Sequence, residues 1–333
     1  MTWLVWVSLV LCVSAAATVG LSAYGLKRWT ESMRTLTSKL NGARIDEKTR
    51  PPSRPSTFDS RELDRLPPCV QRYFRAVLKE GQPVIAAVTV DMAGTFNLSA
   101  TGAQWKPFTS KQRIIIWRPG FLWEARVAML PGVAVRVVDS YIAGEGLLRA
   151  AILGLFPVAD AHGGGELARG EFMRYFAEAA WYPTALLPSQ GVQWEAVDHA
   201  SANATIVDGP LKLTLLFRFN DAGLIDSFRA EARGAGAGKD MVILPWEGHW
   251  SDYRTHDGMT VPFTGEVAWV RPEGRKPYFR GNVTSLTYEF RGDHALPCAA
   301  AAASDSNRLN ALAASARPPG QEASIEVPRG RQH

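Results

Sequence analysis

The chain begins with a long apolar segment that predicts a membrane-spanning helix. None of the 24 residues in the range 3–26 is charged. At a rise of 1.5 Å per residue they form about 36 Å of helix, which crosses a hydrocarbon core of about 30 Å. The competing interpretation is a cleaved signal peptide with Ala15-Ala16-Ala17 as its cleavage site. We favour the anchor because no Lys or Arg precedes the apolar run, and because the run continues beyond that site.

The segments beside the predicted core differ from it in composition. Residues 1–42 comprise the anchor and a short polar helix at 27–42, and residues 43–59 form a linker that contains Pro51, Pro52 and Pro55. Residues 294–333 are rich in Ala, Pro and Arg and lack aromatic side chains after position 298. We expect this tail to be disordered, because it buries too little surface to offset the entropy of ordering.

Alternating apolar residues between turn signals predict a mainly β domain (α+β) over residues 60–293. It begins with a helix whose apolar positions recur at helical spacing over residues 70–78. The predicted strands lie at 84–98, 109–117, 121–130, 133–142, 147–156, 192–197, 202–207, 211–219, 223–232, 243–254, 259–270 and 278–290. Short turns join most of them, so we expect one large, curved antiparallel sheet or half-barrel with two packed helices.

The second helix, predicted at about residues 166–180, interrupts the strands and is apolar around most of its circumference. Its polar stripe consists of Glu171, Arg174 and Glu178, at i, i+3 and i+7. One interpretation is a ladder of ion pairs on the protein surface. The alternative is that the three side chains line a cavity and hold the polar head of a ligand. Trp181 follows the helix directly and would belong to the same site.

Several strands place charged side chains next to aromatic ones. In residues 123–126, Glu124 and Arg126 share one face of a strand and Trp123 lies on the other. Trp246 and Glu247 repeat the pattern on a later strand. A sheet with one solvated face explains this alternation. If the sheet encloses a space, the same residues become candidates for the wall of an apolar ligand site.

Composition and motifs exclude several other functions. The formal charge of +5 is dispersed along the chain, so we expect no nucleic-acid partner. Three cysteines without a CxxC pair do not form a disulfide scaffold, and the signatures of common hydrolases, zinc proteases and nucleotide-binding proteins are absent. Glu247 and His249 would supply at most two metal ligands. We therefore expect no cofactor and no metal.

Five sequence segments resemble a family of uncharacterised bacterial proteins, a domain of unknown function with an N-terminal membrane segment. They lie at residues 70–74, 119–126, 165–188, 245–248 and 265–269, and the resemblance extends over about residues 66–290. It implies the anchor and the proline-rich linker, but no activity and no catalytic residues. At the level of architecture alone, the expected half-barrel is similar to bacterial lipoprotein carriers, which hold acyl chains in their concavity.

These observations lead to three hypotheses. The first is a single-pass membrane protein, with no catalytic activity, that binds an apolar or amphipathic ligand such as a lipid. The second is a scaffold or protein-interaction module of the cell envelope. The third is a hydrolase with a site at Glu171, Glu178, Glu247 and His249. Lys27 and Arg28 after the apolar run favour a cytoplasmic domain, whereas the carrier analogy favours the opposite side, so the membrane side stays open.

Overall fold

The computed structural model describes residues 2–44, 55–99, 102–130, 133–236 and 241–291. The predicted disordered tail and most of the predicted linker lie outside the described residues. The helices are α1 (Thr2–Ala43), α2 (Pro68–Val77) and α3 (Gly165–Ala177), with short 3-10 helices η2 (Ser60–Leu63), η3 (Glu178–Trp181), η4 (Pro183–Leu186) and η5 (Pro188–Gln190).

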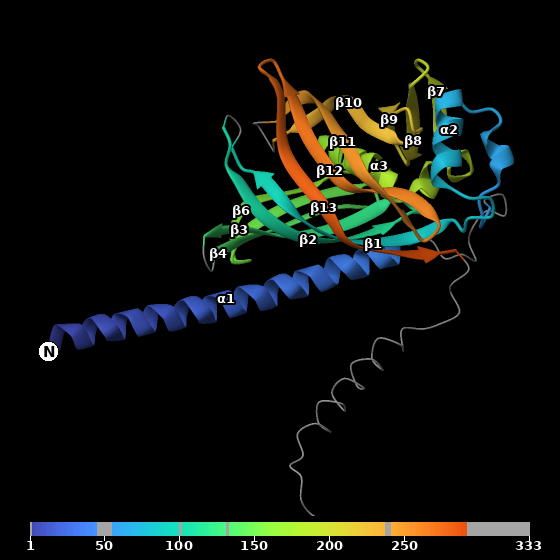
Figure 1. The fold of residues 1–333 in the computed structure, drawn as a ribbon. Coiled ribbons are helices and arrows are strands. Elements are labelled where there is room, and N and C mark those ends of the chain that lie inside the picture. Colours follow the sequence, from blue (N-terminus) through green and yellow to red (C-terminus); the bar gives the residue numbers. More distant parts are fainter. Residues whose placement is uncertain (1, 45–54, 100–101, 131–132, 237–240, 292–333) are drawn as a thin grey trace, which may run out of the picture. The chain divides into compact units, whose positions relative to one another are not determined.

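One antiparallel sheet holds the described strands together (Figure 1). The strands are β1 (Ile85–Asn97), β2 (Trp105–Ile115), β3 (Gly120–Leu130), β4 (Val133–Ile142), β5 (Glu145–Ile152), β6 (Phe156–Gly163), β7 (Gln193–Ala196), β8 (Ser201–Asp208), β9 (Leu211–Phe219), β10 (Ile225–Ala235), β11 (Val242–His256), β12 (Met259–Arg271) and β13 (Gly274–Phe290). Their order is β6-β5-β4-β3-β2-β1-β13-β12-β11-β10-β9-β8-β7. Two meanders therefore join along the β1–β13 pair, and α3 carries the chain from one edge of the sheet to the other.

The fold class predicted from the sequence is confirmed. The described chain is mainly β, with one antiparallel sheet, few helices and a long apolar N-terminal helix. One predicted strand runs across two elements. The run at 147–156 contains most of β5, a turn and the first residue of β6, and β6 was not predicted as a strand of its own. Pro157 and two alanines weaken the strand signal of β6, and as an edge strand it tolerates the proline that a central strand does not.

The two faces of the sheet carry different packing. The inner face, which we define as the face against α3, holds the larger apolar core, built from all the strands except β5 and β6 together with side chains of α2 and α3. In this core Tyr73 and Phe74 of α2 contact Phe219 and Trp194. The sheet bends around α3, so the helix lies within its curvature (Figure 1). An amphipathic helix and two meanders thereby bury one shared apolar surface.

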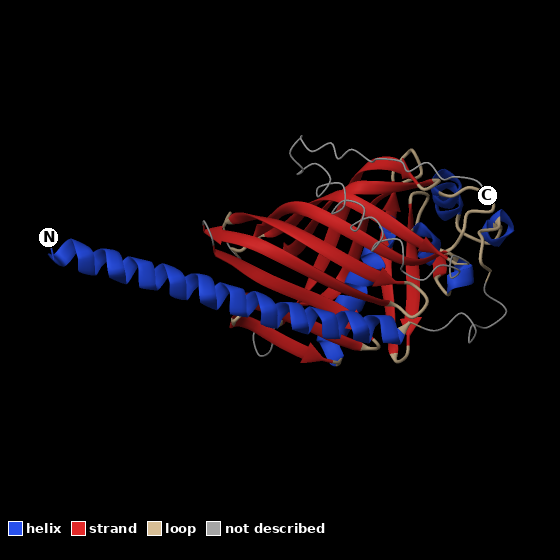
Figure 2. Ribbon diagram, turned by 90° about the horizontal axis from the view of Figure 1, so that it is seen from below, coloured by secondary structure: helices blue, strands red, loops and turns tan. Residues whose placement is uncertain are grey.

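The outer face of the sheet is covered in part by the second half of α1 (Figure 2). Trp29, Met33 and Leu40 of α1 are buried against this face, with Leu36 partly buried beside them. These positions recur at i, i+4, i+7 and i+11, the spacing of a packed helical stripe. The segment predicted to continue the span as a short polar helix at 27–42 is thus the docked half of one long helix.

Docking begins at Gly25, where α1 reaches the turn between β5 and β6. A Cβ atom at Gly25 would lie 2.2 Å from the main-chain oxygen of Leu153, so only glycine permits this approach. The apolar side chains before Gly25 are mostly exposed, and α1 is the one helix in the described part of the chain that is long and apolar enough to cross a membrane. Three further apolar residues are exposed nearby in the strands: Phe156 and Val158 in β6, next to this turn, and Leu130 at the end of β3.

Candidate functional site

The polar stripe of α3 is buried between the two halves of the sheet. Glu171 is 6% exposed, and the side chains of Arg174 and Glu178 are 15% and 12% exposed. The helix contacts β4 and β5 on one side and β9 and β10 on the other, which removes the stripe from solvent. The interpretation of this stripe as a surface ion-pair ladder is therefore wrong.

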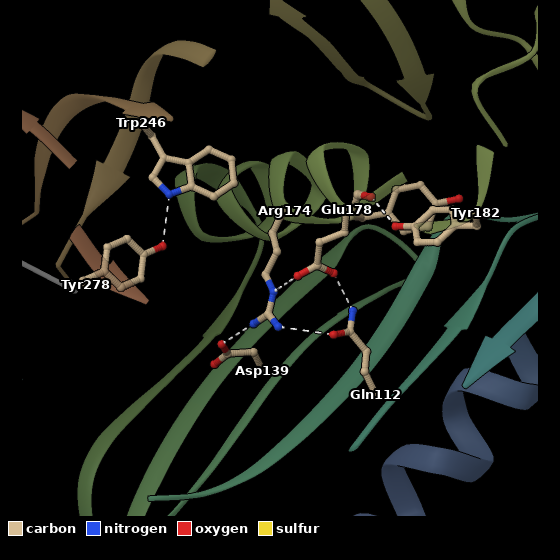
Figure 3. Close-up of polar contacts among 8 residues, drawn as sticks. Gln112, Asp139, Arg174, Glu178, Tyr182, Trp246 and Tyr278 are labelled. Atoms are coloured by element: carbon tan, nitrogen blue, oxygen red, sulfur yellow. Dashed lines mark hydrogen bonds and ion pairs between the residues drawn. The ribbon is translucent and has the colours of Figure 1, made fainter. Parts of the chain in front are cut away.

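Arg174 is the centre of a buried polar group (Figure 3). Its Nε donates to Glu178 Oε1 at 2.8 Å, its Nη1 donates to Asp139 Oδ2 at 2.8 Å, and its Nη2 donates to Gln112 Oε1 at 3.4 Å. Gln112 Nε2 in turn donates to Glu178 Oε2 at 2.6 Å. The guanidinium also lies 4.6 Å from the ring centroid of Trp123. Charge-assisted hydrogen bonds between largely buried groups fix these side chains in one arrangement.

Burial changes the protonation of the two nearby acids. It raises the pKa of Glu171 to about 8, and the negative charge of Asp139 adds to this, against the opposing effects of Arg233 and Arg174. Burial also raises the pKa of Asp139, more than Arg174 lowers it. Burial by itself lowers the pKa of Arg174, but the negative charges of Glu178 and Asp139 raise it by more. The net shift is upward, so this arginine stays charged. At neutral pH Glu171 is therefore mostly a neutral carboxylic acid.

A pocket with an empty volume of about 620 Å³, including the part that opens to solvent, lies on the inner face beside this polar group. Half of its lining residues are aromatic, and they come from β1, β10, β11, β13 and η3. The lining residues are Phe96, Asp139, Arg174, Ala177, Glu178, Trp181, Phe228, Arg233, Trp246, Trp250, Gly265, Val267, Tyr278 and Phe279. An apolar wall with a few polar groups is the usual character of a small-molecule site.

The aromatic wall is held by specific contacts. Trp246 Nε1 donates to the hydroxyl of Tyr278 at 3.0 Å (Figure 3). Trp181 and Trp250 meet edge to face with ring centroids 4.9 Å apart. A Cβ atom at Gly265 would lie 2.7 Å from the ring of Trp250, so the glycine makes room for that ring. These contacts preform the wall in the absence of a ligand.

Arg233 of β10 reaches this pocket because of a β-bulge. Ala230 pairs with Trp246, but Arg233 pairs with Leu244, so three residues of β10 span two residues of β11. Strict alternation from Ala230 would place Arg233 on the outer face, and the extra residue turns it to the inner face. Its guanidinium carbon lies 4.0 Å from the ring centroid of Trp246, and Arg233 is 8% exposed.

The structure divides the site residues proposed from the sequence into two groups. Arg174, Glu178, Trp181 and Trp246 line the pocket. Glu171 is buried next to them on α3, and Trp123 is buried in the inner core beneath Arg174.

Glu124, Arg126 and Glu247 lie on the outer face, away from the pocket. Glu124 accepts a hydrogen bond of 2.6 Å from Trp29 of α1, and Glu247 pairs with two arginines of the outer face. Arg126 is exposed. The period of two residues that places Trp123 and Trp246 inward directs their charged neighbours outward.

His249 is exposed on the outer face with Glu247, so the four residues of the hydrolase hypothesis do not converge. Within the described ranges, no group of three or more His, Cys, Asp or Glu side chains is placed to hold a metal ion.

Sequence reasoning missed Asp139, Gln112 and Arg233. Asp139 shares its strand face with Val137 and Tyr141, and Gln112 shares its face with Ser110 and Ile114. The single charged residue on the otherwise apolar face of β4 was thus a readable signal for a buried polar group, whereas Gln112 stands beside a second polar residue. Arg233 gave no such signal because a bulge is not visible in the alternation.

Comparisons with known proteins give the following. No curated protein matches the chain in sequence. A LolA superfamily protein from Nitrosomonas europaea is similar in structure at 8% identity, with a TM-score of 0.38, and the match covers 69% of this chain and 93% of that chain.

A β-barrel-like protein of the domain of unknown function DUF1849 from Brucella abortus is similar at 11% identity, with a TM-score of 0.20, over 62% of this chain and 99% of that chain. Similarity at these scores supports no inference about function. The model of the family of unknown function DUF6920 matches residues 64–288, and the chain belongs to that family.

Proposed function

We propose that this chain is a membrane-anchored, non-catalytic binding protein whose inner-face pocket holds an amphipathic small molecule such as a lipid. The observation that carries the proposal is the pairing of an aromatic wall with a buried polar group in one pocket. Apolar parts of a ligand gain about 25 cal/mol for each Å² that they remove from water. The charged side chains at one side of the pocket would orient a polar head.

The position of the pocket supports uptake from a membrane. Phe96 and Phe279 lie near the ends of the strands joined by the β1–β2 and β12–β13 turns. Since alternate turns of a meander lie at the same end of its strands, the β5–β6 turn that contacts Gly25 belongs to this end as well. Figure 1 shows the first half of α1 extending beyond this end of β3 and β4, and Figure 2 shows it extending beyond the sheet.

The docking of α1 supports an anchor that belongs to the folded protein. Residues 2–24 extend about 35 Å at 1.5 Å per residue, which matches the hydrocarbon thickness. The following residues are fixed to the outer face through Trp29, Met33 and Leu40. The span and the sheet are thereby joined without a loop, which would hold the pocket at a fixed height above the membrane.

The test is native mass spectrometry of the full chain, extracted from membranes in a maltoside detergent, followed by analysis of extracted lipids. The proposal predicts a stoichiometric amphipathic adduct. Val267→Phe should displace it, because Val267 lines the pocket. Val270→Phe is the matched control. Val270 lies on the same strand as Val267 but on the outer face, since it pairs with Arg275 of β13, whose side chain contacts Glu247 on that face. A wild-type chain without adduct that takes up nothing from added lipid extract would refute the proposal.

A further inference from the structure

The pocket contains hydrogen-bond donors that have no acceptor in the described protein. Arg233 Nε and Nη1, Trp181 Nε1 and Trp250 Nε1 are buried and make no hydrogen bond. All three residues line the pocket. Among the lining residues, the one buried side-chain acceptor without a partner is Asp139 Oδ1. Buried donors are almost always paired in folded proteins, so this excess indicates a ligand that brings acceptors.

Arg233 differs from the other arginine of the site in its partners. Arg174 is paired with Asp139 and Glu178. Arg233 has aromatic neighbours in their place, Trp246 at 4.0 Å and Trp269 at 5.7 Å from its guanidinium carbon. Stacked rings hold the guanidinium in position but accept none of its in-plane hydrogen bonds. The bulge turns this charged side chain into the pocket, where Asp139 and Glu171 act on it through their charges but Nε and Nη1 of the guanidinium make no hydrogen bond.

We infer that the ligand carries an anionic oxygen group, a carboxylate or a phosphate, which accepts hydrogen bonds from Arg233 while its apolar chain lies against the tryptophans. This inference rests on the proposed function and names the chemical class of its ligand. Guanidinium groups suit carboxylates and phosphates because their planar donors match these acceptors.

Hydrogen bonding rather than net charge would select this group. The lining residues set two arginines, Arg174 and Arg233, beside two carboxylate residues, Asp139 and Glu178, so their formal charges balance. The pocket is then neutral overall, and an acid is held by donors placed at short range. A neutral ligand of the same chain length would fill the same wall but would leave the Arg233 donors unpaired, which is costly in a buried site.

The experiment compares three probes that share one apolar chain: hexadecanoate, hexadecyl phosphate and hexadecanol. Each is titrated into the full chain in maltoside micelles, and bound probe is measured by native mass spectrometry. Arg233→Gln removes the guanidinium. Arg229→Gln is the matched control, because Arg229 lies on the same strand and pairs on the outer face with Glu231 and Glu247.

We expect at least one of the acids to bind tenfold or more tightly than hexadecanol. Arg233→Gln should reduce acid binding to the level of hexadecanol and leave hexadecanol binding unchanged, which also shows that the variant is folded. Arg229→Gln should bind as wild type does. The acid with the larger preference identifies the head group as carboxylate or phosphate. Equal binding of acids and alcohol by the wild type, or an acid preference that survives Arg233→Gln, would overturn the inference. Failure of all three probes would instead refute the proposed function.

Discussion

Replacement of Arg174 by methionine tests whether the buried polar group is a coupled unit. The substitution leaves Asp139 and Glu178, with side chains 15% and 12% exposed, without the cation that both contact at 2.8 Å. Removal of one partner of a buried ion pair costs about 3–5 kcal/mol, because the remaining charge stays desolvated and unpaired. We expect a loss of this size in the free energy of unfolding of the full chain in detergent, measured by tryptophan fluorescence in denaturant.

The coupling predicts a rescue. Asp139→Asn and Glu178→Gln, added to Arg174→Met, remove the stranded charges and should restore most of the lost stability, since neutral replacements of whole buried ion groups are often tolerated. Arg254→Met is the control at a surface pair with Asp252, and it should cause no measurable change. A cost below about 1 kcal/mol for Arg174→Met would contradict this account, because breakage of a desolvated pair costs several times that. A triple variant as unstable as the single one would also contradict it.

Three further predictions concern the acid on α3 and the anchor. The folded-state pKa of Glu171 lies above its unfolded value of 4.5, so its contribution to stability is full below about pH 4.5 and is lost as the pH rises through about 8. Within this window the free energy of unfolding should fall by about 1.4 kcal/mol per pH unit through this group, and Glu171→Gln should remove that slope in denaturation curves. An unchanged slope in the variant would contradict the raised pKa of Glu171. Gly25→Ala, whose Cβ would meet the oxygen of Leu153, should increase hydrogen exchange in the docked half of α1, whereas Gly42→Ala, with nothing within 4 Å, should not; equal protection in both variants would argue against tight docking. Phe156 is 52% exposed beside the turn that α1 contacts, so a polarity-sensitive dye attached to a Phe156→Cys variant should report an apolar environment in lipid nanodiscs. The same dye on Val197→Cys should report a solvent-like environment. Solvent-like emission at both positions would place the β5–β6 turn away from the bilayer.

Local pattern predicted the sheet because its strands alternate between apolar and polar residues and are separated by strong turn signals. Residues 133–142 and 211–219 were predicted with the bounds that β4 and β9 have. The period of two residues also separated Trp123 and Trp246 from their charged neighbours. The period of two residues did not predict which set of side chains faces a cavity, because that depends on which face of the sheet packs toward α3.

The missing parts of the site depend on tertiary geometry. Arg233 enters the pocket through a bulge, which shifts the alternation by one residue and leaves no trace in the local pattern. Asp139 and Gln112 acquire their partner only when α3 crosses the sheet and brings Arg174 between them. For α1 the signal was present in the spacing of Trp29, Met33, Leu36 and Leu40, but the charged residues between these positions made the segment look solvated.

The most direct test of the central claim is to locate a bound amphiphile on the chain. The full chain in lipid nanodiscs would be irradiated with a hexadecanoic acid that carries a photoreactive diazirine near the end of its chain, and the labelled peptides would be identified by mass spectrometry. The account predicts labelling of the inner face at Trp181, Phe228 or Val267, and its loss in the presence of excess hexadecanoate. Labelling confined to the apolar half of α1 and to the outer face would contradict it, because the probe would then report the bilayer alone.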